Sequence, residues 1–415
     1  MKYLKLVVSL SVLSLWGCKT TPPIQIESKP KNPEDPKQQP VPTQTNPGLS
    51  QNPKQQSTYK YDPSRPPPGH SNHGEAFNKG PRQAAYLMGT TSNVSFPITT
   101  DSTEAQSFFN QGIGQLHGFW YLEAERSFRQ VLKLHPEHPM AYWGIAMANA
   151  KNRARSQSIM KKAVAGRSKV GNRGQMWIDS MNAYQNETDS KKRKAARLKS
   201  YQNISDKYPE DLEAQAFLAL AMYNNVRGKK NYDEVEKRIA KILAKNPKHP
   251  CHHYRIHLWD YKDPKRAVVS VAQCGQSAPG IAHMWHMPGH ILSRLKRYND
   301  ATWQQEASAR VDHAHMMRDR IMPDRIHNFA HNNEWLTRNL SQAGKVTHAL
   351  DMAKNMIELP RLPNVKEDGS WSFPGRSSHY YGRKHLYDLL TNYELWADVI
   401  KLKDTHYFKS YKTAS

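Results

Sequence analysis

The chain has 415 residues and a formal net charge of +24, a length that suits one large or two ordinary domains with buried cores. It lacks a glycine-rich phosphate loop, a dinucleotide-binding fingerprint and a nucleophile elbow, which excludes the protein classes that depend on those motifs. Basic residues are spread along segments such as 190–202 without interleaved aromatic residues that could stack on bases. We therefore expect no nucleic-acid partner and interpret the basic residues first as a solvated helix face, with anionic lipids or envelope polymers as the alternative partner.

The first residues have the pattern of a secretory signal peptide. An apolar run from Leu6 to Trp16 follows two lysines and leads to Gly17 and Cys18. The run is too short for a permanent membrane span, and its end resembles a bacterial lipobox with an atypical Trp16. We expect residues 1–18 to be the signal and Cys18 to be lipidated, with ordinary signal-peptidase cleavage as the alternative. Lys19, in place of an aspartate, predicts a lipid anchor in the outer membrane of a Gram-negative cell, facing the periplasm.

Residues 19–75 differ in composition from the rest of the chain. They are rich in Pro, Gln, Lys and Asn and poor in large apolar residues. Such a segment cannot bury enough apolar surface to offset the entropy lost on ordering. We predict a disordered tether that holds a folded domain, residues 76–415, away from the membrane.

The folded domain consists of repeated apolar helices with short breaks that contain Pro, Asn or Gly. The clearest unit is Ala105 to Pro136, in which Phe108, Gly112, Ala124 and Phe128 have the spacing of a tetratricopeptide repeat (TPR). Further helical hairpins are predicted at 175–208, 212–247, 249–274, 281–315, 325–360 and 379–401. The pattern predicts an all-α, TPR-like solenoid, in which each hairpin buries its apolar face against its neighbours.

Two cysteines lie in this domain, Cys251 and Cys274. An exported protein meets conditions that permit disulfides, and the two residues fall at the start and the end of one predicted hairpin. A bridge would stabilise the fold by about 3 kcal/mol in the chain-entropy model. Two unlinked, buried thiols are the alternative, and the sequence does not choose between them.

The stretch "HMWHMPGH" contains three histidines in eight residues, His283, His286 and His290. Their spacings of three, four and seven place them on one face of a helix. Trp285 and Gly289 take the packing positions of the repeat, so the histidines are expected on the inner, concave face. Pro288 predicts a kink or a late start of this helix.

Histidine pairs also occur in the neighbouring hairpins. Ten of the 20 histidines lie between residues 252 and 331. The pairs are spaced four apart, as His253 with His257 and His327 with His331. Because the first helices of successive hairpins stand side by side, the histidines of three hairpins can converge in one groove. Four other side chains are candidates for the groove or for support of the histidines: His117, Tyr254, Asp260 and Asn328.

Five ordered segments together resemble a family of exported bacterial TPR proteins. They are "LHGFWYLEA", "HPMAYWGIAMA", "HPCHHYRIHLWD", "HMWHMPGHILSRL" and "RIHNFAHNNEWL", and the resemblance covers roughly 93–340. It implies a solenoid whose family-typical histidines correspond to those named above, and it implies no particular reaction. The chain departs from the family at "LKLHPEHPMAYWG", which lacks an acidic-Pro-Cys stretch.

Two functions follow from the histidines. Neutral imidazole is a common ligand for transition metals, and paired histidines on helices present their nitrogens to one ion, which favours zinc or copper. An open three-histidine site could activate water, as in a metal-dependent hydrolase or oxidase, although no substrate is indicated. The alternative is a metal-free scaffold whose histidine-lined groove binds protein, peptide or cell-wall polymer.

Overall fold

The computed structural model describes residues 85–226, 229–365, 371–373 and 376–408. Contacts divide the chain into residues 1–60 and 61–415, and every described residue belongs to the second unit. The predicted signal peptide 1–18, the lipidation site Cys18, the linker 19–75 and the start of the repeat domain at 76 lie outside the described residues.

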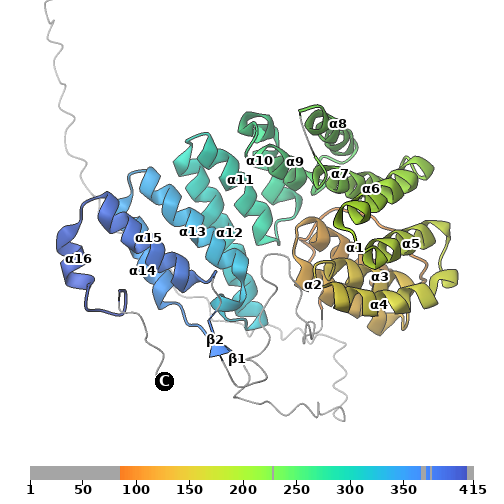
Figure 1. The fold of residues 1–415 in the computed structure, drawn as a ribbon, viewed down its shortest axis with the longest axis horizontal. Helices are drawn as coiled ribbons and strands as arrows, with labels where there is room; N and C mark the ends of the chain where they lie inside the picture. The colour runs from red at the N-terminus through yellow and green to blue at the C-terminus, as the bar shows by residue number, and fades with distance from the viewer. Residues whose placement is uncertain (1–84, 227–228, 366–370, 374–375, 409–415) are drawn as a thin grey trace, which may run out of the picture. The chain divides into compact units, whose positions relative to one another are not determined.

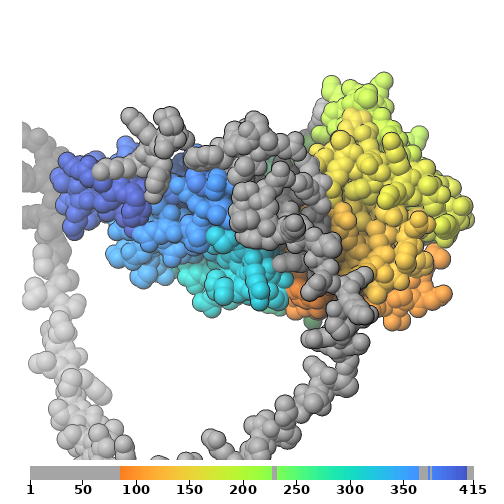
Figure 2. All heavy atoms as spheres, turned by 90° about the horizontal axis from the view of Figure 1, so that it is seen from below, coloured from red at the N-terminus to blue at the C-terminus, as the bar shows by residue number. Residues whose placement is uncertain are grey.

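The described residues form sixteen α-helices, which pair into successive antiparallel hairpins. Figure 1 shows them in chain order, and Figure 2 shows the orange and yellow helices on one side and the cyan and blue helices on the other. The bounds of the first eight helices are α1 Thr103–His117, α2 Tyr121–Leu134, α3 Pro139–Ala148, α4 Arg153–Ala165, α5 Asn172–Asn186, α6 Ser190–Lys207, α7 Leu212–Tyr223 and α8 Lys229–Lys245. Those of the other eight are α9 Cys251–Trp259, α10 Pro264–Ser277, α11 Ala282–Arg294, α12 Tyr298–Asp319, α13 His327–Gln342, α14 Val346–Glu358, α15 Ser378–Asn392 and α16 Trp396–Leu402. The prediction of an all-α hairpin repeat is confirmed.

Close helix contacts in the first hairpins depend on two glycines beside the buried ring of Phe128. A Cβ added at Gly112 of α1 would lie 2.6 Å from the Phe128 ring, and one added at Gly144 of α3 would lie equally close at 2.6 Å. The ring therefore fills the space between α1 and α3, and neither position tolerates a side chain without movement. Phe109 completes the contact with an edge-on approach at 5.1 Å.

The core of the N-terminal hairpins is aromatic. Phe96, Trp143 and Trp177 are fully buried, with ring centroids 5.4 Å apart for Phe96 and Trp143 and 5.6 Å apart for the two tryptophans. Burying a large apolar side chain contributes about 1.5–3 kcal/mol, so these rings anchor α3 and α5 against the segment before α1.

Side-chain caps fix where several helices begin. The Asp211 carboxylate accepts hydrogen bonds from the backbone N–H groups of Glu213 and Ala214, at 3.0 and 3.1 Å, as expected for an N-cap. Arg173 donates to the same carboxylate at 2.6 Å. This cap fixes the start of α7 at Leu212, directly before Glu213, whose side chain enters the histidine-rich region described below.

Short elements other than α-helices join some of the hairpins. Strands β1, Asn364–Val365, and β2, Trp371–Ser372, pair antiparallel between α14 and α15. Short 3-10 turns occupy Arg167–Lys169 and Pro323–Arg325. Among the described helices, none is both long and apolar enough to cross a membrane.

The structure decides two expectations about the later hairpins. Cys251 and Cys274 are both buried, free thiols, so the disulfide is not formed and the alternative of unlinked thiols holds. Burial raises the pKa of the Cys274 thiol. Pro288 lies inside α11, which begins at Ala282, so the helix does not start late.

Candidate metal centre

The predicted histidines come from the first helices of three consecutive hairpins, α9, α11 and α13, which pack against one another in that order. The structure brings six of the seven predicted metal ligands into two groups of three. In each group the potential ligand atoms all lie within 4.8 Å of one another. The α9 triad consists of His253, His257 and His283, and the α11 triad consists of His286, His290 and His331.

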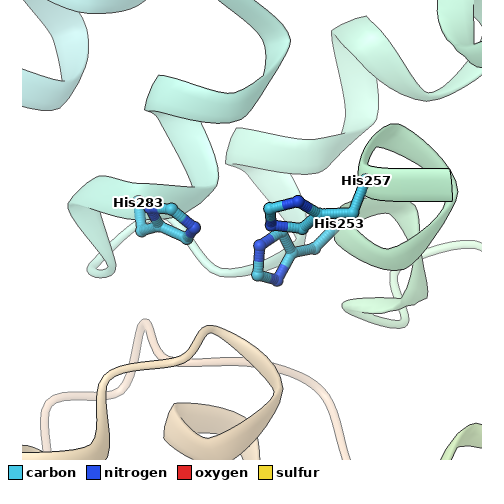
Figure 3. Close-up of side chains that lie close together, drawn as sticks. All are labelled: His253, His257 and His283. Carbon is cyan, nitrogen blue, oxygen red and sulfur yellow. The ribbon is translucent and has the colours of Figure 1, made fainter. Parts of the chain in front are cut away.

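The α9 triad joins the two hairpins of α9 and α11. Figure 3 shows the His283 ring of α11 facing the rings of His253 and His257 on α9. The ring centroids of His253 and His257 are 4.6 Å apart, and that of His283 lies 4.9 Å from His253 and 5.9 Å from His257. Three imidazoles therefore surround one small space.

The outer nitrogens of two of these rings face oxygen acceptors. Nδ1 of His253 lies 2.7 Å from the backbone oxygen of His117, and Nδ1 of His283 lies 3.1 Å from Oδ1 of Asn328. Asn328 donates its amide to Asp312 at 2.7 Å, which turns Oδ1 toward His283 as an acceptor. Each Nδ1 therefore carries the proton, and each Nε2 carries a lone pair suited to a metal.

His257 supplies the third nitrogen in a neutral state. Its Nε2 is buried and has no hydrogen-bond partner among the described residues. Burial lowers the pKa of His257 to about 4, so the ring is uncharged at neutral pH. A buried imidazole nitrogen without a partner is costly, and a bound ion would satisfy it.

In the α11 triad, the Nδ1 atom of each of the three rings faces an oxygen acceptor. Nδ1 of His286 lies 2.7 Å from Oε1 of Gln305 and 3.1 Å from Oδ1 of Asn332. Asn332 donates its own amide to the backbone oxygen of Gln305 at 2.7 Å, and Gln305 donates to the backbone oxygen of His286 at 3.3 Å. These bonds fix both amide oxygens as acceptors, so the proton of His286 is on Nδ1.

Carboxylates support the other two rings. Nδ1 of His290 lies 3.2 Å from Oδ2 of Asp260, and Nδ1 of His331 lies 3.1 Å from Oε2 of Glu334. Burial works against the charge of Asp260, but the hydrogen bond with His290 and the neighbouring Arg294 outweigh it and lower the pKa of the carboxyl. The carboxylate is an acceptor only, so His290 is also protonated on Nδ1.

The inner nitrogens of His286 and His290 then face each other. Their Nε2 atoms are 2.8 Å apart, and with both protons on Nδ1 each presents a lone pair to the other. Burial lowers the pKa of both rings, which disfavours a shared proton. Two lone pairs at this separation repel unless a cation lies with them, and a metal ion is the cation that histidine triads bind.

A third group contains His117, Glu213 and His249, and its polar atoms are already paired. His117 contacts Tyr254 through Nδ1 at 2.5 Å and Glu213 through Nε2 at 2.6 Å. His249 contacts the other Glu213 oxygen at 3.3 Å and accepts from the Cys251 backbone N–H at 3.1 Å. This closed set of bonds, the Glu213 network, needs no metal. Sequence reasoning missed Glu213 and His249, because no spacing pattern connects them with the histidine pairs.

His327 is the predicted ligand that joins neither triad. Its ring stacks on His331 at 5.8 Å, and its Nδ1 lies 3.3 Å from the backbone oxygen of Arg376. It begins α13, one helical turn before His331. The other predicted supporting residues lie next to the triads: Asp260 and Asn328 contact ring nitrogens directly, and Tyr254 lies in the Glu213 network.

The triads are largely buried, whereas a ligand-exposed concave face was expected. His253 and His286 are fully buried and His283 has 8% of its surface accessible, while His257 and His331 are partly exposed. The α1–α2 turn covers the α9 triad through Phe119, whose ring lies 4.5 Å from that of His253. Trp335 stacks on His290 at 4.0 Å and covers the α11 triad. The covering of the rings by Phe119 and Trp335 was not predictable, because contacts this far apart in the sequence leave no local pattern.

Comparisons with known proteins add little beyond the fold. No protein-family model matches the chain, and no curated protein is similar to it in sequence. Among solved structures, the crystal structure of yeast Tom70 is similar, with a TM-score of 0.38 and 12% identity over 77% of this chain and 73% of that chain. By its own helices, the chain is a TPR-like helical-hairpin repeat protein with two buried histidine triads. The resemblance to exported bacterial TPR proteins stays a prediction.

Proposed function

We propose that the two triads each bind a transition-metal ion and that the chain is a metal-binding repeat protein of the cell envelope. The observation that carries the proposal is the pair of facing Nε2 atoms of His286 and His290, 2.8 Å apart, whose Nδ1 atoms both face oxygen acceptors. Outer hydrogen bonds of this kind are what orient metal-binding histidines in proteins.

Zinc is our first choice of metal and copper our second. Each triad offers three imidazoles, and zinc binds three histidines with a fourth position left for water or another ligand. Copper also binds thioether sulfur, but Met284 and Met287, the methionines of the same helix, are packed in the apolar core. A three-histidine zinc site supplies Lewis-acid and water-activating chemistry, so a metal-dependent hydrolase is the enzymatic extension of the proposal.

Localisation rests on the sequence alone. We propose that lipidation at Cys18 anchors the protein to the outer membrane, where the net charge of +24 favours contact with anionic lipids or polymers. Intact-mass analysis of the mature N-terminus tests this: a diacylglycerol-modified Cys18 is expected, and an unmodified mature terminus at another residue contradicts it. The alternative of a metal-free scaffold that binds peptide through exposed histidines loses support from the burial of both triads.

Metal analysis of the full chain tests the central proposal. Purified protein reconstituted with zinc should hold about two equivalents, one for each triad. His286→Ala/His290→Ala and His253→Ala/His257→Ala should each lose about one. His313→Ala/His348→Ala is the matched control, because both side chains are exposed and outside the triads. The proposal would be contradicted if the unsubstituted protein held less than about a tenth of an equivalent of bound metal for every first-row metal offered.

A further inference from the structure

We propose that a cavity beside the α9 triad binds a small amphipathic anion and presents it to the metal held there. The cavity has a volume of about 640 Å³, within the usual range for small-molecule sites. The α1–α2 turn and helices α3, α5, α6 and α7 contribute to its walls, and His257 of α9 lies at its lining. The second half of the inference, delivery to the metal, rests on the proposed function.

One part of the cavity is apolar. Leu116, Phe119, Met147, Phe217 and Leu220 contribute to its walls, and Leu116 and Phe217 are almost fully buried, at 4% and 2% exposure. An apolar body of a ligand would find a dry, preformed surface here, and burying it would contribute about 25 cal/mol for each Å² removed from water.

The other part of the cavity is positively charged. Its lining includes five cationic side chains and, among the described residues, no carboxylate; the five are Lys151, Arg153, Arg193, Lys194 and Arg197. No ion pair with an acidic group is found for any of them among the described residues. An uncompensated group of like charges beside a cavity favours an anionic ligand by charge complementarity.

Two arginines are placed to hold the anion. The Nε atoms of Arg193 and Arg197 are buried and have no hydrogen-bond partner among the described residues. The Arg197 guanidinium lies 3.3 Å from the centre of the Tyr184 ring and donates to the sulfur of Met181 at 3.2 Å, so its plane is fixed. Both side chains line the cavity, where the guanidinium N–H groups on the cavity side would donate charge-assisted hydrogen bonds to a carboxylate, sulfonate or phosphate.

The cavity and the α9 triad share His257 and are also joined through Phe119. His257 lines the cavity and belongs to the triad, and Phe119 lines the cavity while its ring lies 5.5 Å from that of His257. A ligand with its head at the arginines and its body along Phe119 therefore extends toward the triad. The ligand class is an organic anion with an apolar or aromatic body of drug-like size.

Decanoate binding to the full chain tests the cavity. Calorimetric titrations use zinc-loaded and chelator-stripped protein, with decyltrimethylammonium as the charge-reversed probe. We expect one decanoate per chain and binding at least about tenfold weaker for the cation, because one or two charge-assisted bonds are lost. Equal binding of the two probes would overturn the proposal.

Two sets of variants place the ligand. Arg193→Gln/Arg197→Gln should weaken decanoate binding about tenfold or more, while Lys192→Gln/Lys199→Gln, exposed positions on the same helix with the same charge change, should not. Leu220→Trp should block the cavity without altering its charge, which keeps the proposal testable if the arginine variant misfolds. Unchanged binding in Leu220→Trp, or an equal loss in the lysine control, would overturn the site.

The link to the metal has its own readout. His283→Ala, which removes a triad ligand that does not line the cavity, should weaken decanoate binding to zinc-loaded protein and leave binding to stripped protein unchanged. Equal affinities of zinc-loaded and zinc-stripped protein for decanoate would contradict delivery of the ligand to the metal. They would not contradict binding in the cavity. Because zinc content is measured separately, a chain that holds zinc but does not bind decanoate refutes this inference alone, and one that binds decanoate without holding zinc refutes the proposed function.

Discussion

At the scale of single residues, the two triads differ in the oxygen acceptors that face the Nδ1 atoms of their histidines. The outer nitrogens of His253 and His283 face a backbone oxygen and an amide oxygen, whereas those of His290 and His331 face carboxylates. A carboxylate that accepts a hydrogen bond from Nδ1 of an imidazole makes Nε2 of the same ring a stronger ligand for a metal ion. We therefore expect the α11 triad to bind zinc more tightly than the α9 triad.

Removing Asp260 should weaken the α11 triad alone. Asp260→Ala takes away the acceptor that orients His290, and loss of such a partner typically lowers metal affinity about 10–100-fold. Competition with a zinc chelator measures each site. Arg294→Ala is the control, because it removes the other partner of Asp260 and leaves the contact with His290. A similar loss of zinc affinity in both variants would show that zinc binding depends on the ion pair of Asp260 with Arg294 and not on the support of His290.

The Glu213 network predicts a pH dependence of stability. Burial opposes the charge of Glu213, but His249 and His117 outweigh it and lower the pKa of the carboxyl below its ordinary value of 4.5. Stability from Glu213 is therefore present above pH 4.5 and is lost as the pH falls through the lowered pKa.

Comparing unfolding free energies with those of Glu213→Gln isolates this contribution. In urea titrations of chelator-stripped protein, the difference between the two proteins should be fully present above pH 4.5 and should shrink as the pH falls below it. A difference that does not change with pH would mean that the network stabilises by packing and not by charge.

At the scale of helices, the hairpins follow from local sequence and the histidine sites do not. Small residues such as Gly112 and Ala124, with a proline after the second helix, were enough to place α1 and α2. The division of the α11 histidines was not predictable, because His283 and His286 share a face and differ only in the neighbour that each one meets. That choice depends on how α9 and α13 pack on α11. The cover over the α9 triad depends on Phe119, a residue far away in the sequence.

Gly112→Ala tests the helix contact behind the repeat pattern. The new Cβ would lie 2.6 Å from the Phe128 ring, which is buried between α1 and α3, so the ring or the helix must shift. Overpacking typically costs about 1–3 kcal/mol, against a gain in helix propensity of about 1 kcal/mol. Chemical denaturation should show a net loss. Gly171→Ala, with no atom near the added Cβ, should change stability little; an equal loss there would contradict the packing explanation.

At the scale of the whole molecule, each metal would join neighbouring repeats. The α9 triad spans the hairpins of α9 and α11, and the α11 triad spans those of α11 and α13. The aromatic core of the N-terminal hairpins, around Trp143 and Trp177, contains none of these ligands. Metal binding should therefore stabilise one part of the repeat array and leave the other unchanged.

Chelation tests this local effect through hydrogen exchange. Removing zinc should speed exchange in α9, α11 and α13 and leave α3 and α5 unchanged. An ion held at 100 times its dissociation constant contributes about 2.7 kcal/mol, so the change in exchange is measurable. A protein that lacks both triads, with the four substitutions at 253, 257, 286 and 290, should not respond to the chelator. Exchange that rises uniformly along the chain would contradict a local role.

The most direct test of the two metal sites is anomalous diffraction at the zinc absorption edge from crystals of the full chain grown with zinc. The account predicts two peaks, each at about 2.0–2.1 Å from the Nε2 atoms of one triad, namely His253, His257 and His283 for the first and His286, His290 and His331 for the second. Occupied zinc at surface positions with no peak at either triad would contradict it.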